Sequence, residues 1–318
     1  MAGLLKTDSP DYEEHKKAEI EHYSEVFSGF AGPAEVRPLL QPVPPVWTEM
    51  EVRSTELIRN AVGSVLTSYL IKRLRPTPGA TMISLGSGPG GIELTVAEWT
   101  PEASILCTDF NPALLDLGRQ RATSQGFPVR FEQMDLNTAD LPQAAFDVVF
   151  CHASLHHVIE LERLADQIHQ TLRPGGELVV LDVVTPSGYQ MWPETRDVVR
   201  NLWRTLPKEL RVNHTAYPEG PRFDEDFWEA DTSKSGMECI RSGEIIQILS
   251  ERFERKVFVP YYSISRRFFD TMYGPNYDLD NSLHRSIVDF IWELDRHYIR
   301  SGALKPETFF GIYTTGTR

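Results

Sequence analysis

A short apolar segment followed by a glycine-rich loop, at residues 80–91, constrains this chain more than any other feature. Its sequence is ATMISLGSGPGG, and the apolar part is typical of a buried parallel strand. The segment GIELTVAEW that follows predicts a helix whose free N–H groups point back at the loop. Glycine accepts positive φ and lets a ligand lie against bare backbone. The stretch therefore predicts a strand, a loop and a helix that cradle a polar, nucleotide-like molecule.

Strand-like and helix-like segments alternate from residue 80 to residue 184. Asn111 is a predicted helix N-cap with Pro112 in the first turn, and Arg-Pro-Gly-Gly at 173–176 predicts a turn. Apolar strands separated by helices predict a parallel, doubly wound α/β sheet. The expected strands are residues 82–85, 103–109, 128–135, 146–152 and 177–184.

The segments before this alternation predict helices and a connector. Residues 11–30 and 53–74 have the apolar spacing of amphipathic helices. Prolines crowd the segment 31–47 between them, which we expect to be extended.

The segments after the alternation predict a cap and a completed sheet. Residues 186–240 lack sustained periodicity and predict an inserted cap over the carboxyl edge of the sheet. A helix at 243–252 and a helical insertion at 265–302 accompany two further strands, the last of which is expected to return antiparallel. Those strands, at 255–262 and 307–315, bring the expected total to seven. The expected divisions of the chain are residues 1–78, 79–185, 186–240 and 241–318.

Net charge and cysteine spacing restrict the partners. The chain has 32 basic and 45 acidic residues, a net charge of −13, which repels phosphate backbones and anionic lipid heads. Cys107, Cys151 and Cys239 lie far apart, which fits neither a disulfide framework nor a zinc site, so no metal site is predicted. The apolar run near the start of the sequence is too short for a signal peptide, and no stretch contains 18 consecutive apolar residues. We therefore expect a cytoplasmic protein that binds neither nucleic acid nor membrane.

The glycine loop alone leaves the nucleotide open. Gly86, Gly88 and Gly91 satisfy the G-x-G-x-x-G pattern, and Asp109 ends the next predicted strand. A dinucleotide-dependent dehydrogenase is thus one interpretation.

Three further signatures accompany the loop LGSGPGG, in order and at regular spacing. They are the acid after the second strand, Met134-Asp135-Leu136 after the third, and FDVVFCHASLHHV followed by LRPGG. Together they resemble the class I S-adenosylmethionine-dependent methyltransferases, in the branch that includes menaquinone- and ubiquinone-biosynthesis and natural-product enzymes. The resemblance covers roughly residues 78–184 and implies a Rossmann-like methyltransferase fold with S-adenosylmethionine as cofactor. A dehydrogenase would give no reason for Asp135 or for the added strand pair.

The resemblance also implies roles for individual residues. Asp109 would accept both ribose hydroxyls, since a carboxylate offers two acceptors and no donor, with Phe110 beside the adenine. Asp135 and the backbone of Leu136 would take the adenine amino group, and His152 would border the methionine part and open into the substrate pocket. The cofactor-binding residues so implied are Gly86, Ser87, Gly88, Gly90, Asp109, Phe110, Asp135, Leu136 and His152.

One position departs from the family pattern. Two residues before the first loop glycine the family commonly carries an acid that helps to place the amino group of the cofactor, and here that residue is Ser84. We expect looser cofactor binding or a carboxylate supplied from elsewhere in the chain.

Two adjacent histidines are the candidates for catalysis. Imidazole titrates near neutral pH, so His156 or His157 could take a proton from a substrate hydroxyl or amine during methyl transfer. The alternative for each is a histidine that is merely satisfied by hydrogen bonds. Other candidates are Tyr23, Asp182, Glu194, His214 and Tyr217, with Trp192, Trp203 and Trp228 as walls of an apolar pocket or anchors of the cap. The aromatic run 266–278 predicts a substrate lip or a dimer contact.

The sequence therefore predicts an S-adenosylmethionine-dependent methyltransferase that acts on a small organic molecule, with a homodimer as one expected assembly. A secondary metabolite is the expected substrate, and O-methylation is favoured slightly over N- or C-methylation. A second hypothesis is a protein of methyltransferase fold that binds the cofactor or an apolar ligand without transferring methyl. Methylation of a protein partner is disfavoured, because the insertions are predicted to cover a pocket.

Overall fold

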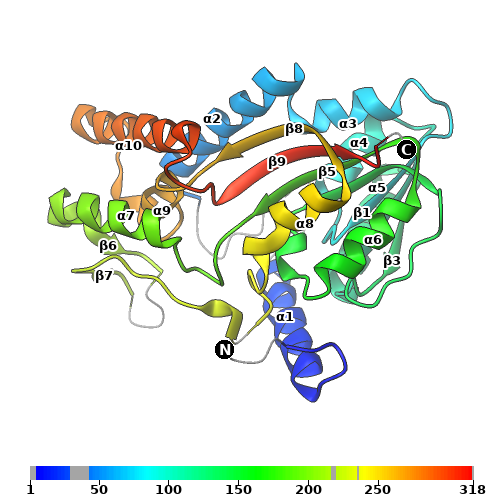
Figure 1. The fold of residues 1–318 in the computed structure, drawn as a ribbon, viewed down its shortest axis with the longest axis horizontal. Coiled ribbons are helices and arrows are strands. Elements are labelled where there is room, and N and C mark those ends of the chain that lie inside the picture. The colour runs from blue at the N-terminus through cyan, green and yellow to red at the C-terminus, as the bar shows by residue number, and fades with distance from the viewer. Residues whose placement is uncertain (1–4, 29–42, 216–219, 235, 317–318) are drawn as a thin grey trace.

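The computed structural model describes residues 5–28, 43–215, 220–234 and 236–316, with most of the proline-rich segment 31–47 outside that range. One seven-stranded sheet runs through the molecule in the order β3-β2-β1-β4-β5-β9-β8 (Figure 1). The first five strands in that order are parallel, and β9 pairs antiparallel with both β5 and β8. This confirms the predicted fold class. The strands are β1 (Thr81–Leu85), β2 (Ser104–Asp109), β3 (Val129–Gln133), β4 (Phe146–His152), β5 (Leu172–Val183), β8 (Glu254–Tyr261) and β9 (Thr308–Thr314).

Helices cover both faces of the sheet, and each face buries its own apolar cluster. The cluster on one face includes side chains of α2, α3, α4, α5 and α10, and that on the other includes α6 and α8. The central strands have no exposed face, which explains their nearly continuous apolar sequences. These helices are α2 (Pro45–Val62), α3 (Leu66–Leu74), α4 (Gly91–Trp99), α5 (Pro112–Gln125), α6 (Leu161–Thr171), α8 (Ile245–Arg252) and α10 (Ser282–Ser301).

Helix boundaries follow local signals, some of which the sequence analysis read correctly. Asn111 caps α5 as predicted, and its side chain accepts a hydrogen bond of 3.0 Å from the backbone N–H of Ala113. The single helix predicted at 53–74 was wrong, because Gly63 ends α2 with φ of 72° and α3 starts separately at Leu66. Helix α2 also begins at Pro45, inside the segment that was predicted to be extended.

The predicted turn at 173–176 is joined to β5. The strand begins at Leu172, and its pairing with β4 is irregular between Phe146 and Val148. Gly175 has φ of 78°, so the backbone bends where the sequence predicted a turn, and the pairing with β4 is interrupted between Leu172 and Glu177.

Two segments at the carboxyl ends of the parallel strands enclose the site. One is α1 (Pro10–Ser28), which lies below the sheet in Figure 1. The other is the cap between β5 and α8, which contains α7 (Pro193–Thr205) and the pair β6 (Val212–Asn213) and β7 (Arg222–Phe223). The remaining short elements are α9 (Ser265–Phe269) and the 3-10 helices η1 (Leu155–His157), η2 (Lys208–Arg211), η3 (Thr232–Lys234), η4 (Ser242–Glu244) and η5 (Gly274–Asn276).

The cap has an aromatic core of its own. Trp203 is fully buried, with ring centroids of Tyr273, Phe227 and Phe268 at 4.6, 5.2 and 6.2 Å. Its indole N–H reaches the carbonyl oxygens of residues 224 and 225 at 3.3 and 3.1 Å. Trp203 is therefore an anchor of the cap and not a pocket wall.

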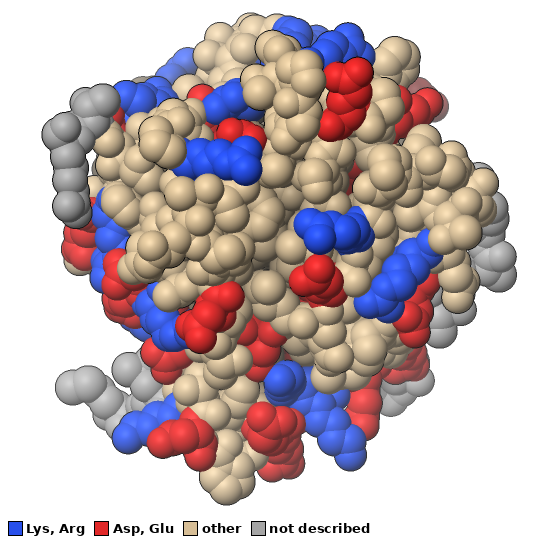
Figure 2. All heavy atoms as spheres, turned by 90° about the vertical axis from the view of Figure 1, so that its right-hand side faces the viewer, with Lys and Arg blue, Asp and Glu red and all other residues tan. Residues whose placement is uncertain are grey.

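The surface carries both signs of charge. Figure 2 shows acidic and basic side chains interspersed on the face drawn there, without a continuous basic stripe on that face. Among the described residues, no helix combines the length and the apolarity needed to cross a bilayer.

Packing between α5 and the glycine loop yields a stability prediction. A Cβ at Gly118 would lie 2.3 Å from Cε1 of Phe131, and the same ring lies 3.0 Å from where a Cβ of Gly90 would be. The ring therefore has no room to move toward the loop. We expect Gly118→Ala to lower the free energy of unfolding by about 1–3 kcal/mol, although alanine is favoured over glycine inside a helix by about 1 kcal/mol.

Urea denaturation followed by circular dichroism measures this change. Adding Phe131→Leu to Gly118→Ala makes room for the new methyl group and should recover part of the loss. A Gly118→Ala protein at least as stable as the wild type would contradict the packing described.

Candidate functional site

Two adjoining cavities lie at the carboxyl ends of the parallel strands. The first has a volume of about 350 Å³ and the second of about 450 Å³. Both are lined by Glu19 and Tyr23 of α1, by Glu238 of the cap and by Arg266 of α9. These four residues form the boundary between the cavities. Parallel sheets place ligands at this edge, where the loops after several strands meet.

The glycine loop forms one wall of the first cavity. Gly86 follows β1 with φ of 70°, and a Cβ there would lie 2.5 Å from Cβ of Ser154. Only glycine fits this position, because any side chain would collide with the turn after β4. Gly86 therefore brings bare backbone against whatever occupies the cavity.

Asp109 ends β2 and faces the same cavity. Its carboxylate accepts hydrogen bonds from the backbone N–H groups of Gly88 at 2.9 Å and Asn111 at 2.8 Å. Burial raises the pKa of Asp109, and these two bonds oppose the rise. The carboxylate thus ties the glycine loop to the start of α5 and still lines the cavity beside Phe110.

Asp135 is held by the N-terminal helix. The hydroxyl of Tyr12 donates to both carboxylate oxygens at 2.8 Å, and Lys16 Nζ lies 2.7 Å from Oδ2. The backbone N–H of Asn137 adds a fourth contact at 3.0 Å. Burial raises the pKa of Asp135, but these donors outweigh it and hold the pKa below its usual range. Asp135 therefore anchors α1 over the first cavity, a role that the sequence analysis did not foresee.

His156 forms a buried dyad with Asp182. Nδ1 of His156 lies 2.5 Å from Oδ1 of Asp182, and the two side chains are 5% and 0% exposed. Burial lowers the pKa of His156, but the charges of Asp182 and Glu238 outweigh it, so the net pKa lies well above 6.5. The pKa of Asp182 is lowered, because the charge of His156 and its hydrogen bond overcome the effect of burial. With Nδ1 engaged by Asp182, Nε2 of His156 is directed away from it, toward Glu238 at 3.7 Å.

His157 is held in a similar way by a carboxylate from α1. Its Nδ1 lies 2.7 Å from Oε1 of Glu19, and its Nε2 lies 3.8 Å from Glu238. The ligand atoms of His156, His157 and Glu238 lie within 4.8 Å of one another, which is close enough to consider a metal ion. Glu238 lies 3.7 Å from Nε2 of His156 and 3.8 Å from Nε2 of His157, so one carboxylate faces both rings. We interpret the three side chains as an ion-pair cluster.

Ser84 does not face the first cavity. Its hydroxyl donates to Oε1 of Glu93 at 2.5 Å, and both side chains are buried. Burial raises the pKa of Glu93, which favours its neutral acid. Glu93 is therefore no substitute for the family's usual acid, and among the described residues neither side chain lines the cavity.

The structure brings most of the expected residues together. Lining the first cavity are Gly86, Asp109, Phe110, Asp135, Leu136, His156 and His157. Ser87, Gly88, Gly90 and His152 are not among its lining residues in the described part of the chain, and the side chain of His152 is exposed. Of the further candidates, Tyr23 lines both cavities and Trp228 lines the second, while Tyr217 lies outside the described residues.

Several lining residues were not singled out from the sequence, among them four with polar or charged side chains. Glu19, Asn137, Glu238 and Arg266 come from α1, from the turn after β3, from the cap and from α9. None has a motif around it, because each is placed by packing of a segment outside the family signatures. Only Arg266 had a signal, since it opens the aromatic run 266–278 that predicted a substrate lip.

Comparison with known proteins identifies the central domain. Residues 83–176 match a family described as a methyltransferase domain. A demethylmenaquinone methyltransferase of Thermus thermophilus is 31% identical over 105 residues, which are 33% of this chain and 48% of that protein. The ubiquinone/menaquinone biosynthesis C-methyltransferase UbiE of Geotalea daltonii is 25% identical over 121 residues, 37% of this chain and 52% of that protein. The chain thus spans about half the length of these curated relatives.

A solved structure extends the likeness in fold to the whole chain. The cyclase SpnF aligns with a TM-score of 0.53 at 16% identity, over 99% of this chain and 100% of that one. The Rossmann-like fold and the resemblance to class I S-adenosylmethionine-dependent methyltransferases, which came from the sequence, are confirmed.

The contacts of α1 with Asp135 give a prediction about local stability. Lys16→Met removes the ion pair with Asp135, so α1 should open more readily. We expect a loss of about 1 kcal/mol and roughly fivefold faster amide exchange in residues 10–25.

Hydrogen exchange followed by mass spectrometry measures this opening. Lys17→Met is the matched control, because Lys17 is exposed and pairs only loosely with Glu21 at 3.7 Å. Equal exchange in the two variants would show that Asp135 does not anchor the helix.

Proposed function

We propose that this chain, with its methyltransferase domain at residues 83–176, transfers a methyl group from S-adenosylmethionine to a hydroxyl-bearing small organic molecule. The observation that carries the proposal is the pair of adjoining cavities, with His156 of the His156–Asp182 dyad lining the first cavity and its Nε2 turned toward Glu238, which lines both. The first cavity has the features of a nucleoside site, and the second has space for an acceptor. Their volumes suit small molecules.

The residues of the first cavity fit the proposed cofactor. Asp109 offers carboxylate oxygens where ribose hydroxyls would bind, Phe110 offers an apolar ring to the adenine, and Gly86 leaves room for the amino-acid part. Because Asp135 is already engaged by Tyr12 and Lys16, the backbone at Leu136 is the better candidate to contact the adenine amino group. S-adenosylmethionine, when bound, supplies a methyl group that is already activated for transfer.

His156 is proposed as the proton acceptor. Asp182 holds Nδ1, so Nε2 is the atom that can take a proton from an acceptor hydroxyl at the boundary. The neutral form of the ring is needed for this step, and the imidazolium formed afterwards is stabilised by Asp182 and Glu238. His157 is proposed to orient the acceptor or the boundary carboxylates, since Glu19 holds its Nδ1.

The segments around the dyad exclude water and fix geometry. Helix α1 covers the first cavity through Asp135 and lines the second through Ala18 and His22. The cap supplies Tyr189, Trp228 and Cys239 to the second cavity. Methyl transfer needs alignment of the reacting atoms and a dry site, and an enclosed pocket provides both.

Oxygen is the proposed acceptor atom, because an imidazole and carboxylate dyad serves a hydroxyl directly. The curated relatives support a second candidate, since UbiE of Geotalea daltonii bears the name of a C-methyltransferase. A ring carbon next to a deprotonated hydroxyl would use the same dyad, and the position of the new methyl group in the product, read by NMR, separates the two.

Binding without transfer is the rival function. The fold alone does not decide, since a protein named as a cyclase shares it. We expect calorimetric titration to show micromolar binding of S-adenosylmethionine and S-adenosylhomocysteine and no binding of NADH. The Asp109→Ala variant should no longer bind either sulfur-containing nucleoside. Tritium transfer from labelled S-adenosylmethionine to hydroxylated acceptors then tests the reaction itself.

The outcomes of that experiment separate the hypotheses. Binding of NADH instead would restore the dehydrogenase interpretation. Cofactor binding without label transfer across a broad acceptor panel would favour the non-catalytic protein. With an accepted substrate, His156→Gln should slow transfer at least about tenfold, and an unchanged rate would remove His156 from the mechanism.

The pKa of His156 provides a test that needs no acceptor. NMR titration of the histidine side chains should give His156 a midpoint well above 6.5, assigned by its loss in His156→Gln. Glu238→Gln removes a carboxylate that favours the imidazolium, so the midpoint should fall. Because the neutral ring is the base, the transfer rate should rise with pH through this pKa, and Glu238→Gln should move that rise to lower pH.

A carboxylate of the cap that does not line either cavity serves as the control for Glu238. Glu225 is exposed in the same cap, and Glu225→Gln should leave the midpoint of His156 unchanged. A wild-type midpoint at or below 6.5, or no shift in Glu238→Gln, would rule out the electrostatic arrangement described.

A further inference from the structure

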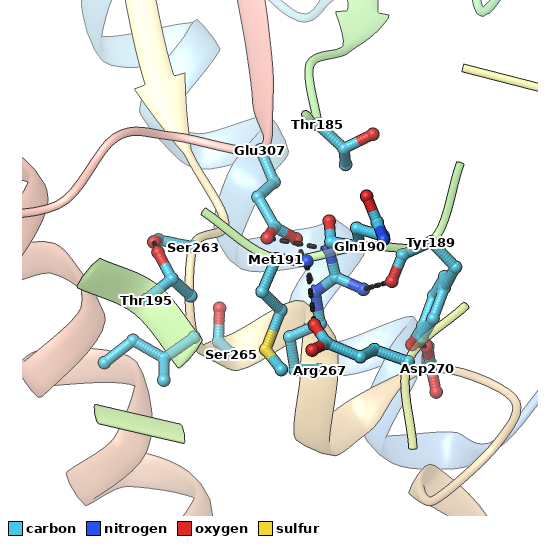
Figure 3. A network of polar contacts seen from close by, with 12 residues as sticks. Thr185, Tyr189, Gln190, Met191, Thr195, Ser263, Ser265, Arg267, Asp270 and Glu307 are labelled. Carbon is cyan, nitrogen blue, oxygen red and sulfur yellow. Dashed lines mark hydrogen bonds and ion pairs between the residues drawn. The ribbon is translucent and has the colours of Figure 1, made fainter. Parts of the chain in front are cut away.

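The short helix α9 lies beside both cavities and is held from several sides. Ser265 donates to Asp295 at 2.5 Å. Arg267 contacts Glu307 at 2.7 Å and donates to the carbonyl oxygens of Tyr189 and Gln190, as Figure 3 shows. The side chains of Ser265, Arg267 and the two phenylalanines that complete the helix are fully buried. Arg266 is therefore the one residue that α9 presents to the cavities.

The guanidinium of Arg266 lacks a partner. Its Nη1 is inaccessible to solvent, and the parts of the chain that the structure describes offer it no hydrogen-bond or ion-pair acceptor. The neighbouring Arg267 shows the contrast, because its charge is matched by the buried carboxylate of Glu307 (Figure 3). A buried guanidinium N–H without an acceptor costs free energy, and a bound anion would offset that cost.

The carboxylates around the cavities are already satisfied by other groups. Glu19 contacts His157 and accepts from the backbone N–H of Met237, and Glu238 faces both histidines. Asp109 accepts two backbone N–H groups, and Asp135 is held by Tyr12 and Lys16. None of these four carboxylates forms an ion pair with Arg266 in the part of the chain that the structure describes.

We propose that Arg266 binds an anionic group, a carboxylate or a phosphate, on the acceptor that occupies the second cavity. A guanidinium presents paired N–H donors that match such groups. The inference rests on the proposed function, since it calls the ligand of the second cavity the acceptor. It narrows the substrate class to hydroxylated organic anions.

The other walls of the second cavity suit a flat apolar body. The rings of Tyr189 and Trp228 lie with centroids 5.4 Å apart and planes inclined by 35°. The hydroxyl of Tyr189 is bonded to Asp270, and the guanidinium of Arg267 lies 4.3 Å from its ring centroid, so the ring is fixed in place. An aromatic acid could lie along these rings with its anionic group toward Arg266.

A carboxylate could also come from the cofactor, because Arg266 lines the first cavity as well. The two sources differ in what they predict. If the cofactor supplies the carboxylate, removing the charge of Arg266 weakens the binding of S-adenosylhomocysteine. The binding of 5′-methylthioadenosine, which lacks the amino-acid part, is then unaffected. If the acceptor supplies it, both nucleosides bind as before.

Equilibrium dialysis with a matched pair of probes tests the proposal. Protein saturated with S-adenosylhomocysteine is titrated with 2-naphthoate and with the neutral 2-naphthamide. We expect the wild type to bind naphthoate at least about tenfold more tightly, Arg266→Gln to bind the two alike, and Arg266→Lys to keep part of the preference. Arg300→Gln, which removes an exposed charge on α10, should behave as wild type.

Other outcomes overturn the proposal. The first is a wild-type protein that binds neither probe, or binds both with the same affinity. The second is a preference for naphthoate that survives in Arg266→Gln. The third is an Arg266→Gln protein that binds S-adenosylhomocysteine about tenfold more weakly but binds 5′-methylthioadenosine with unchanged affinity. Thermal denaturation of each variant confirms that it is folded. Failure of methyl transfer with the anion preference intact would reject the proposed function and leave the anion site standing.

Discussion

The site depends on how the buried carboxylate of Asp182 is satisfied at the end of β5. With no exposed surface, it accepts hydrogen bonds from the backbone N–H groups of Ser154, Leu155 and Val183 and contacts the imidazole of His156. A buried charge needs such a set of donors, because nothing else replaces its water. Two of the donors belong to the turn after β4, so one carboxylate fixes that turn against β5 and turns Nε2 of His156 toward Glu238 at the boundary of the cavities.

Around this fixed point, the segments outside the methyltransferase domain complete the site. Helix α1 reaches the turns after β2, β3 and β4, through Asn111, Asp135 and His157. The cap is joined to the turn after β4 by a bond from the backbone N–H of Ile240 to the carbonyl oxygen of His156. The proposed methyl transfer to a small molecule would need a covered site, and the cover is tied by polar contacts to the turns that line the first cavity.

The sequence was most informative where local patterns decide the structure. Buried parallel strands are short apolar runs, and Asn111 followed by proline is a helix start whatever surrounds it, so the sheet and the first cavity could be anticipated. Side chains that act across the fold could not. Tyr12 contacts Asp135 and Glu19 contacts His157, and each contact joins segments more than 100 residues apart. Arg266 likewise lines a cavity together with residues of α1 that lie more than 200 positions earlier in the chain. Two helix boundaries were predicted wrongly. Apolar spacing continues past Gly63, so the end of α2 there was not predicted, and the prolines before residue 47 were taken to exclude a helix although Pro45 begins α2.

A crystal structure of the protein with S-adenosylhomocysteine tests the central claim most directly, namely that the two adjoining cavities divide cofactor from acceptor, with His156 in the first cavity near the boundary. The account predicts the nucleoside in the first cavity, with its ribose at Asp109, while the second cavity stays open and Arg266 faces it. A nucleoside bound in the second cavity, or one that fills both and separates His156 from any acceptor, would contradict the account.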